Sequence, residues 1–311
     1  MKKLHLSQFN ARGPRNNVEY WFDLIHDELE KQEHEVRQFW LRGTQPKKED
    51  IEWMDFAIYH FSQVALYYRR IGVPFCIMPS ANDCFPDNGA KLKIAASHKN
   101  CRFVTYQSMY HLKKYKEWDI PKPKVYVPHP VRTELFKRDK FRYDRILAGG
   151  RLIPKKGLDK IVGKVAGLTV FGDGPLRKDL EEGAFRWSKT KATEFTGWLD
   201  GQQLKNLMEE SWLFLNPSVV TSDGDSDGVP NTIKEAMLMK MHVISTPVAG
   251  IPELENITLL SDWSNIWKVI QDMPRQWNWK GDKEIRSIYT PKFCVNRLLE
   301  GIEEYGKIKE I

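Results

Sequence analysis

Short apolar runs alternate with amphipathic helical stretches along nearly all of this 311-residue chain. An apolar run at 2–7 precedes the stretch 17–32, whose apolar side chains recur at the three- and four-residue spacing of one helix face. Further apolar runs of strand length follow at 34–40, 55–60, 73–78, 102–106 and 124–128. Strands that alternate with helices are typical of parallel sheets with crossover helices, so this order predicts an α/β fold.

A second series of the same kind follows a proline-containing, densely charged segment. Its apolar runs lie at 145–150, 167–172, 193–197, 212–216 and 242–246, and a last helix is predicted at about 291–308. We therefore predict an N-terminal domain (1–130), a linker (131–143), a C-terminal domain (144–290) and a C-terminal helix (291–311) that packs back on the N-terminal domain. Two Rossmann-like parallel-sheet domains that face each other form a cleft between the carboxyl ends of their sheets, where such folds bind ligands.

The composition favours a folded protein of the cytoplasm. Hydrophobic residues make up 41% of the chain, and no apolar run reaches the roughly 18 residues that span a bilayer. The two lysines at the start are not followed by an apolar stretch, which argues against a secretory signal. Four cysteines without a CxxC pair are expected to be free thiols in a reducing compartment.

Positive charge is concentrated in the first half of the chain. Residues 1–143 hold 25 Lys and Arg against 17 Asp and Glu, whereas residues 144–311 hold 23 against 24. The stretch 60–132 alone holds 12 against 4. A basic half beside a neutral half predicts an anionic partner for the N-terminal domain, and a solvated surface without a partner is the alternative.

Three glycine-containing motifs of the second half follow predicted strands. In GGRLIPKKG (149–157), Gly149 and Gly150 allow a ligand to approach the backbone, and Arg151 and Lys156 place two cations beside a predicted helix start, which suits a diphosphate. FGDGPLR (171–177) contains a glycine turn but lacks the GxGxxG spacing of dehydrogenases. In FTGWLD (195–200), Trp198 is either a wall of a base pocket or a core residue.

The fourth motif, SDGDSDGVPNTIKEAM (222–237), places Asp227 and Glu235 eight residues apart. Residues 228–231 present backbone N–H groups at a predicted helix start, except Pro230, which has none. The spacing of Asp223, Asp225, Asp227 and Gly228 also resembles a calcium loop. Lys234 stands where that loop requires a glutamate, which argues against calcium.

Together these motifs resemble those of the retaining GT-B glycosyltransferases of family 4, the group that includes colanic acid and other exopolysaccharide transferases. The resemblance spans about residues 145–255 and rests on GRLIPKKG, FGDGP, FTGW, DGDSDGVPNTIKEAM and STPVAGIPEL in this order. The segment VPHPVRTELF near the linker is also similar to a segment of this family. The resemblance implies a GT-B fold and a nucleotide diphosphate sugar, either a UDP- or a GDP-sugar, as the donor.

The resemblance also implies roles for single residues. Arg151 and Lys156 would hold the donor diphosphate, Asp227 would contact sugar hydroxyls, and these three residues are the catalytic candidates. Glu235 would hold the nucleotide ribose. The other candidate donor-binding residues are Gly13, Gly150, Gly174, Gly197, Trp198, Gly228, Val229, Pro230 and Asn231.

Two positions depart from the family pattern. Asp227 stands where a glutamate is usual, and Ser80 stands where many members carry a histidine. Ser80 is followed closely by Asn82 and Asp83, and we expect these three residues on the acceptor side. The loss of the imidazole does not abolish the implied chemistry, because the leaving phosphate can take the acceptor's proton in a front-face retaining mechanism.

The sequence thus predicts a retaining glycosyltransferase that moves a sugar to a hydroxyl of a glycan, a lipid-linked molecule or another anionic acceptor. Neither a cofactor nor a metal ion is expected, because Arg151 and Lys156 replace the metal. The protein would be cytoplasmic, with peripheral contact to the inner membrane surface as one option. Two alternatives stay open, a transferase that modifies a hydroxymethylated DNA base and a non-catalytic module that binds nucleotide sugars. Slow hydrolysis of the donor distinguishes an enzyme from the module.

Overall fold

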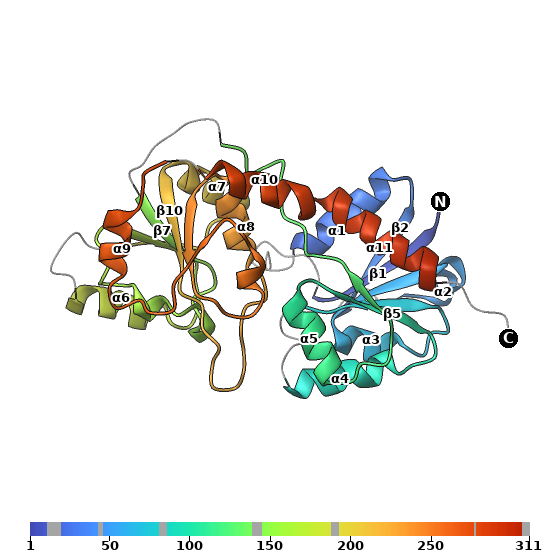
Figure 1. Cartoon of the computed structure of the whole chain (residues 1–311). Helices are drawn as coiled ribbons and strands as arrows, with labels where there is room; N and C mark the ends of the chain where they lie inside the picture. Colours follow the sequence, from blue (N-terminus) through green and yellow to red (C-terminus); the bar gives the residue numbers. More distant parts are fainter. Residues whose placement is uncertain are drawn as a thin grey trace. The chain divides into compact units, whose positions relative to one another are not determined.

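The computed structural model describes residues 1–10, 20–42, 46–80, 86–138, 145–187, 193–276 and 278–306. It divides into two compact units (Figure 1). Unit 1 comprises Met1–Val131 and Ile288–Ile311, and unit 2 comprises Arg132–Ser287. Each unit holds one six-stranded sheet whose neighbouring strands are parallel. The predicted α/β class with two parallel sheets is therefore confirmed.

Unit 1 alternates strands and helices as the apolar periodicity predicts. Its strands are β1 (Lys3–Asn10), β2 (Glu35–Arg42), β3 (Phe56–His60), β4 (Phe75–Met78), β5 (Cys101–Tyr106) and β6 (Lys124–Tyr126). Its helices are α1 (Tyr20–Lys31), α2 (Lys48–Trp53), α3 (Ser62–Tyr68), α4 (Pro86–Ala96), α5 (Met109–Glu117) and α11 (Pro291–Tyr305). The sheet order is β2-β1-β3-β4-β5-β6.

The last helix of the chain completes the core of unit 1. Helix α11 packs against α1, β5 and β6, and Figure 1 shows it lying along α1. Cys294 and Leu298 of α11 are fully buried in one cluster with Phe22 and Phe103. A Cβ on Gly301 would lie 3.1 Å from the Phe103 ring, so a glycine here lets the helix approach the sheet closely. A second apolar cluster, on α3, α4 and their neighbours, contains Tyr59, Val64, Phe75 and Tyr115.

Unit 2 repeats the strand–helix alternation with different details. Its strands are β7 (Arg145–Gly149), β8 (Leu168–Phe171), β9 (Glu194–Gly197), β10 (Ser211–Asn216), β11 (His242–Ser245) and β12 (Thr258–Leu259). Its α-helices are α6 (Arg177–Trp187), α7 (Gly201–Glu209), α8 (Asn231–Leu238), α9 (Ile266–Asp272) and α10 (Trp279–Ile288). Its 3-10 helices are η3 (Pro154–Lys156), η4 (Leu158–Lys160) and η5 (Ile251–Glu253).

The strand order of unit 2 creates a switch point beside its first strand. The order is β12-β11-β10-β7-β8-β9, so the chain moves from β7 to β8 and β9 on one side and then crosses to β10 on the other. The connection from β7 leads to β8, and the connection from β10 leads to β11 on the opposite side. Among the described residues, no crossover therefore covers the carboxyl ends of β7 and β10. Open α/β sheets bind ligands at such a point.

The region after β7 differs from the sequence prediction. The motif ending at Gly157 was expected to lead into a helix, but it ends in one 3-10 helix, η3, and is followed by another, η4. Gly157 separates them with a left-handed φ of 58°, which a residue without a Cβ adopts at little cost. The helix N-terminus expected beside Arg151 and Lys156 is thus replaced by short turns.

The predicted linker also differs from what the structure shows. Residues 132–138 pack on unit 2 rather than running free. The Arg138 guanidinium is buried and donates hydrogen bonds to the carbonyl oxygens of Ser211 (2.7 Å), Glu209 (2.7 Å) and Met239 (3.2 Å). Arg286 holds the same segment through the carbonyl oxygen of Thr133, at 2.9 Å. At least one charged residue of this segment, Arg138, thus anchors the chain to unit 2 rather than facing solvent.

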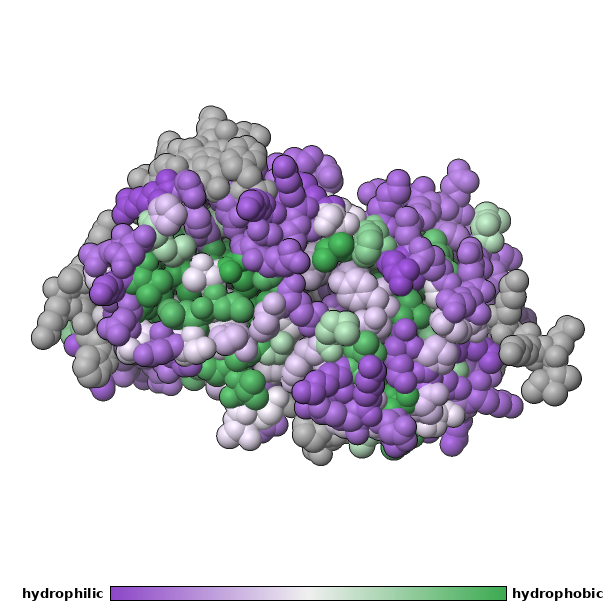
Figure 2. All heavy atoms as spheres, viewed as in Figure 1, coloured by the Kyte–Doolittle hydropathy of each residue, from purple (hydrophilic) through white to green (hydrophobic). Residues whose placement is uncertain are grey.

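Hydrophilic atoms cover most of the face seen in Figure 2. Hydrophobic atoms also reach the surface of unit 2 on this face. In the part of the chain that the structure describes, none of the helices combines the length and the apolarity that crossing a bilayer requires. Cys76, Cys101 and Cys294 are free and buried, in keeping with the expected thiols.

Three of the buried histidines in unit 1 predict a steep acid sensitivity. Burial lowers the pKa of His5, His60 and His111 to about 3 each. These side chains are neutral in the folded state and bind protons below about pH 6.5 once unfolded, so stability falls as the pH drops from 6.5 toward 3. We expect a slope of up to about 4 kcal/mol per pH unit near pH 5, from three protons taken up on unfolding.

Urea unfolding at pH 5.0, 5.5 and 6.0 measures this slope. His111 bonds to Gln107 and Ser108, and the variant H111Q removes one of the three protons. It should reduce the slope by about a third. A slope of one proton or less in the unsubstituted protein would contradict the prediction.

Candidate functional site

The predicted donor residues of unit 2 all follow the carboxyl ends of its strands. Arg151 and Lys156 follow β7, Gly174 follows β8, and Trp198 follows β9. Residues 227–230 lie between β10 and α8, and Asn231 begins α8. Because neighbouring parallel strands end at the same edge of a sheet, the fold gathers the four motifs at one edge, with the switch point at its centre.

A buried ion pair joins the two loops at the switch point. Lys156 Nζ lies 2.7 Å from Asp227 Oδ2, and both side chains are 12% exposed. Lys156 belongs to the turn after β7, and Asp227 belongs to the loop after β10, so the pair spans the gap between the two strand ends. The structure therefore brings together two of the three predicted catalytic residues.

A polar network extends from this pair into the sheet. Ser218 Oγ donates to Asp227 Oδ2 at 2.9 Å and accepts from Asn216 Nδ2 at 3.0 Å. Asn216 Nδ2 also donates to Ser245 Oγ at 2.9 Å, which links β10 to β11. These groups are buried, and their mutual hydrogen bonds hold the Asp227 carboxylate in one orientation.

A second ion pair lies beside the first. Lys155 Nζ lies 2.9 Å from Asp225 Oδ1 and 3.8 Å from Asp227 Oδ1. The main-chain oxygen of Lys155 accepts from Val219 N at 2.8 Å, which ties the 3-10 turn to the loop after β10. Two lysines and two carboxylates therefore alternate across the switch point.

The lysines keep Asp227 ionised despite its burial. Burial acts to raise the pKa of the Asp227 carboxyl group, but the charges of Lys156 and Lys155 and the hydrogen bonds from Lys156 and Ser218 lower it below its ordinary value. A buried carboxylate that stays charged at neutral pH is a strong hydrogen-bond acceptor, suited to hydroxyl groups.

Glycines pack the loops after β7 and β8 tightly together. A Cβ on Gly172 would lie 1.8 Å from the Gly150 carbonyl oxygen, and one on Gly174 would lie 2.5 Å from that of Leu152. The glycine turn of FGDG thus allows the loop after β8 to pack closely against the loop after β7. Gly150 differs, because a Cβ there would meet only the end of the Lys156 side chain, at 3.6 Å.

Of the remaining predicted donor residues, those after β7 and β9 are exposed and those near the start of α8 are mostly buried. Arg151 is solvent-exposed, and Trp198 is 43% exposed, so Trp198 is not the core residue of the alternative interpretation. Gly197 precedes it with a φ of 78°. Gly228, Val229 and Pro230 are buried and Asn231 is half-buried at the start of α8. The Glu235 side chain lies in the buried part of α8 and is 4% exposed.

The aspartates of 223–227 are already occupied by partners other than a metal ion. Asp225 and Asp227 pair with lysines, and Asp223 Oδ1 accepts from Thr221 Oγ1 at 2.5 Å. Within the described ranges, no group of three or more His, Cys, Asp or Glu side chains is placed to hold a metal ion. The lysines at Asp225 and Asp227 therefore argue against the calcium-loop interpretation.

Little of the predicted acceptor side can be placed. Gly13, Asn82 and Asp83 lie outside the described residues. Ser80 is half-buried, two residues beyond the end of β4 and thus at the carboxyl edge of the unit 1 sheet. At the same edge, His60 ends β3 and stacks on Phe61, whose φ is 71°, and the rings of Trp21 and His129 stack at 3.6 Å.

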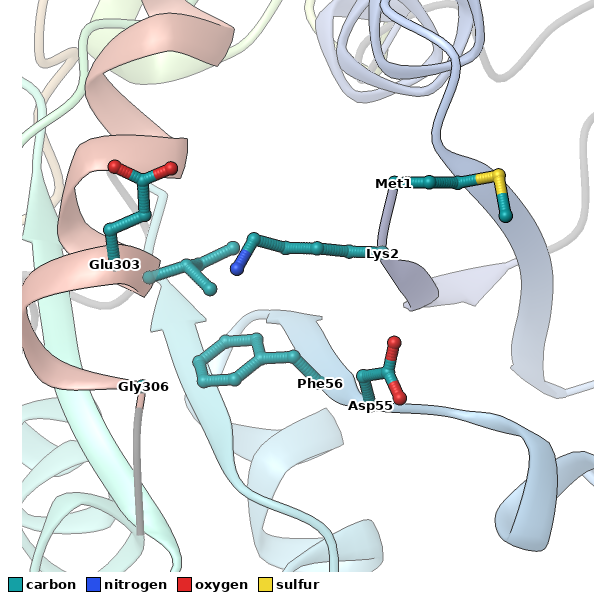
Figure 3. A pocket seen from close by; sticks show the side chains of 7 residues that line it. Met1, Lys2, Asp55, Phe56, Glu303 and Gly306 are labelled. Carbon is teal, nitrogen blue, oxygen red and sulfur yellow. The ribbon is translucent and has the colours of Figure 1, made fainter. Parts of the chain in front are cut away.

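A pocket of about 560 Å³ lies at the opposite, amino edge of unit 1. Lys2 and Asp55 precede β1 and β3, and Glu303 and Gly306 come from the end of α11. Figure 3 shows the Lys2 side chain extending across this pocket past the Phe56 ring. The pocket contains none of the residues predicted from the motifs.

Part of the basic charge of unit 1 also lies at the amino edge. Arg69 and Arg70 precede β4, Lys99 precedes β5, and Lys122 precedes β6. Besides burial, which is the largest cause, these four cations lower the pKa of His98, so all four lie near this side chain. This basic cluster (Arg69, Arg70, Lys99 and Lys122) is remote from the carboxyl edge of its own sheet.

Sequence reasoning missed Lys155, Ser218 and Asn216 as members of the polar network. The sequence did contain a signal for Lys155. Two adjacent lysines after one strand and alternating aspartates at 223, 225 and 227 after another could have predicted two ion pairs. Ser218 and Asn216 gave no signal, since a polar residue after a strand is common in loops.

The buried ion pair predicts a stability change that depends on pH. The variant D227N leaves Lys156 buried without its counter-charge, so we expect the free energy of unfolding to fall by about 2–4 kcal/mol at pH 7. Because the Asp227 pKa is lowered in the folded state, the contribution is present above pH 3.8 and is lost as the pH falls through the folded-state value.

Urea unfolding of D227N at pH 7 tests the size of this loss, with the exposed Asp159 changed in D159N as the matched control. A loss no larger than that of D159N would show that the ion pair does not stabilise the fold.

Sequence comparisons match the part of the chain that forms this edge. A family model described as Glycosyl transferases group 1 matches residues 145–268. The amylovoran biosynthesis glycosyltransferase AmsK of Erwinia amylovora is 32% identical over 135 residues, which are 40% of this chain and 33% of AmsK. The putative colanic acid biosynthesis glycosyltransferase WcaL of Escherichia coli is 30% identical over 118 residues, which are 35% of this chain and 29% of WcaL. The aligned region thus spans about a third of these relatives.

Solved structures resemble nearly the whole chain. HepE of Anabaena, crystallised in complex with UDP, superposes with a TM-score of 0.76 at 15% identity and covers 98% of this chain and 100% of HepE. The sucrose-phosphate synthase of Thermosynechococcus elongatus gives a TM-score of 0.76 at 13% identity, with 98% and 99% covered. At these identities the likeness shows the fold, with two parallel-sheet units as in GT-B glycosyltransferases. Residues 145–268 are therefore a glycosyl transferases group 1 domain, within a chain that has the GT-B fold.

Proposed function

We propose that the protein is a retaining glycosyltransferase that moves a sugar from a nucleotide diphosphate sugar to an acceptor hydroxyl. The observation that carries this proposal is the Lys156–Asp227 ion pair at the switch point of a glycosyl transferases group 1 domain. A cation next to an ionised carboxylate supports a site in which Lys156 binds the diphosphate and Asp227 the sugar hydroxyls.

The proposed grip on the donor uses charge of both signs. Arg151 and Lys156 hold the diphosphate and offset the negative charge that develops on the leaving nucleotide. Asp227 accepts hydrogen bonds from the sugar, and Glu235 accepts them from the ribose. Trp198 packs beside the base, in line with its exposure after β9. HepE was crystallised with UDP, which supports a UDP-sugar, and a GDP-sugar remains the second option.

The proposed reaction keeps the anomeric configuration. The acceptor oxygen forms a bond to the anomeric carbon as the bond from that carbon to the diphosphate oxygen breaks. The acceptor proton passes to the leaving phosphate on the same face. This route requires positioning and electrostatic stabilisation rather than a protein base, which is compatible with Ser80 at the usual histidine position. We also propose that the two cations make a divalent metal ion unnecessary.

Hydrolysis of the donor in the absence of an acceptor tests this proposal. We expect slow release of nucleotide diphosphate from one of UDP-glucose, UDP-N-acetylglucosamine or GDP-mannose, unchanged by EDTA. The K156A variant should reduce the rate about 100-fold, because charge on the leaving group loses its stabilisation. R186A, at an exposed arginine of α6, serves as the control and should leave the rate unchanged.

Binding of UDP or GDP without release from any of these donors would favour the non-catalytic module instead. An EDTA-sensitive rate would contradict only the metal-independent part of the proposal.

For the acceptor, we propose a glycan or lipid-linked molecule whose anchor is anionic. AmsK and WcaL are named for polysaccharide biosynthesis, and a further relative, 29% identical over 150 residues, belongs to the human phosphatidylinositol N-acetylglucosaminyltransferase. The basic cluster lies at the amino edge of unit 1, away from the strand ends where a reacting hydroxyl is expected. It would therefore bind the anchor, such as an anionic membrane surface, rather than the hydroxyl itself.

Vesicle binding tests the anionic anchor. Vesicles with a third of anionic lipid should bind the protein at low salt, and the R70E/K99E/K122E variant should lose about tenfold in affinity. K48E, at an 88% exposed lysine of α2, is the control. Binding to duplex DNA but not to vesicles would favour the alternative of a DNA-modifying transferase. Binding to neither would contradict an anionic anchor.

A further inference from the structure

The Asp227 carboxylate lies between two lysines of one 3-10 turn. Lys156 Nζ is 2.7 Å from Oδ2, and Lys155 Nζ is 3.8 Å from Oδ1 on the other side. The side chain of Lys155 is 10% exposed, as buried as that of Lys156. The function proposed above uses Lys156 and Asp227 but leaves Lys155 without a role.

The proposed reaction creates a problem at Asp227. When the donor binds, Lys156 Nζ must turn toward the diphosphate, and the carboxylate loses its nearest counter-charge. A buried carboxylate without a partner takes up a proton, because burial disfavours the charged form. A protonated Asp227 would be a weaker acceptor for the sugar hydroxyls.

Lys155 is placed to solve this problem. Its Nζ donates to Asp225 Oδ1 at 2.9 Å, so the side chain already points toward Asp227. Its main-chain oxygen is fixed by Val219 N, and Gly157, two residues on, packs against the Pro217 carbonyl oxygen. A shift of roughly 1 Å closes the gap to the length of a charge-assisted hydrogen bond.

We propose that Lys155 is a positioning residue that takes over the Asp227 carboxylate when Lys156 turns to the donor diphosphate, and that it leaves its present partner Asp225 to do so. This inference rests on the proposed function. Lys156 and Lys155 from η3 are the charged side chains that act on Asp227, Ser218 donates to it from the loop after β10, and Asp225 faces Lys155. The four charges balance before the donor arrives.

Kinetics of donor hydrolysis separate this role from a structural one. In K155M, the acid limb of kcat should move up by about one pH unit, because Asp227 loses its remaining cation in the donor complex. The acid limb of kcat/KM should move less, since it reports the free enzyme, in which Lys156 still pairs with Asp227. K155R should restore the wild-type profile, and K164M, at an exposed lysine of the same segment, should not change it.

The variant D225N distinguishes the two possible partners of Lys155. It leaves the charge of Lys155 available to Asp227, so kcat should stay within about threefold of wild type. A loss as large as that of K155M would overturn the proposal, because the pair with Asp225 would then be the one that matters. An unmoved acid limb of kcat in K155M would overturn it as well.

A second experiment needs no turnover. A double-mutant cycle of K155M and D227N, measured by urea unfolding, gives the coupling between the two side chains. The cycle is repeated in the K156M background, which mimics the departure of Lys156. The coupling should be larger there by about tenfold in the unfolding constant, because Lys155 becomes the nearest cation.

The outcomes distinguish a failure of this inference from a failure of the proposed function. Equal coupling in both backgrounds overturns the role of Lys155. Absence of nucleotide release by the unsubstituted protein overturns the proposed function instead.

Discussion

The pairing of Lys156 with Asp227 is the interaction on which the organisation of this site depends. A parallel sheet delivers its strand ends to one edge, but the loops that leave them are free to diverge. Here one short, buried contact fixes the turn after β7 to the loop after β10. The hydrogen bonds of Ser218 and Asn216 then connect that contact to β10 and β11. The loops are thus held together at the point where the connections of β7 and β10 diverge. Rigid placement of charge is what electrostatic catalysis requires.

Much of the fold is predictable from the sequence, and the reason is periodicity. All the strands expected in both halves are present, because runs such as 145–150 are apolar, short and flanked by glycines or polar residues. The departures have local causes. The turn after Lys156 is 3-10 rather than α-helical, and no periodic signal encodes that difference. Residues 132–138 resemble a linker in composition, but one buried arginine that satisfies three carbonyl oxygens anchors them to unit 2.

The site shows a different limit. Motif spacing brought out Arg151, Lys156, Asp227 and Glu235, and the structure puts two of them in contact. Spacing could not show that the glycines of FGDG let the loop after β8 pack against the loop after β7. A glycine that allows two loops to pack and a glycine that allows a ligand to approach are the same letter in a sequence. Nor could spacing show that Lys155 points inward. The turn that carries two adjacent lysines decides whether both are buried, as here, and tertiary contacts determine that turn.

Helix α11 has a consequence for how the protein is made. Unit 2 is a continuous piece of chain, whereas unit 1 joins residues up to 131 with residues from 288 onward. During synthesis, the apolar surface of Phe22 and Phe103 therefore stays uncovered until the whole of unit 2 has left the ribosome. Unit 2 is free to fold first, and the N-terminal sheet must wait for its final helix. A nascent chain thus exposes an apolar face of its N-terminal part until the last helix is made.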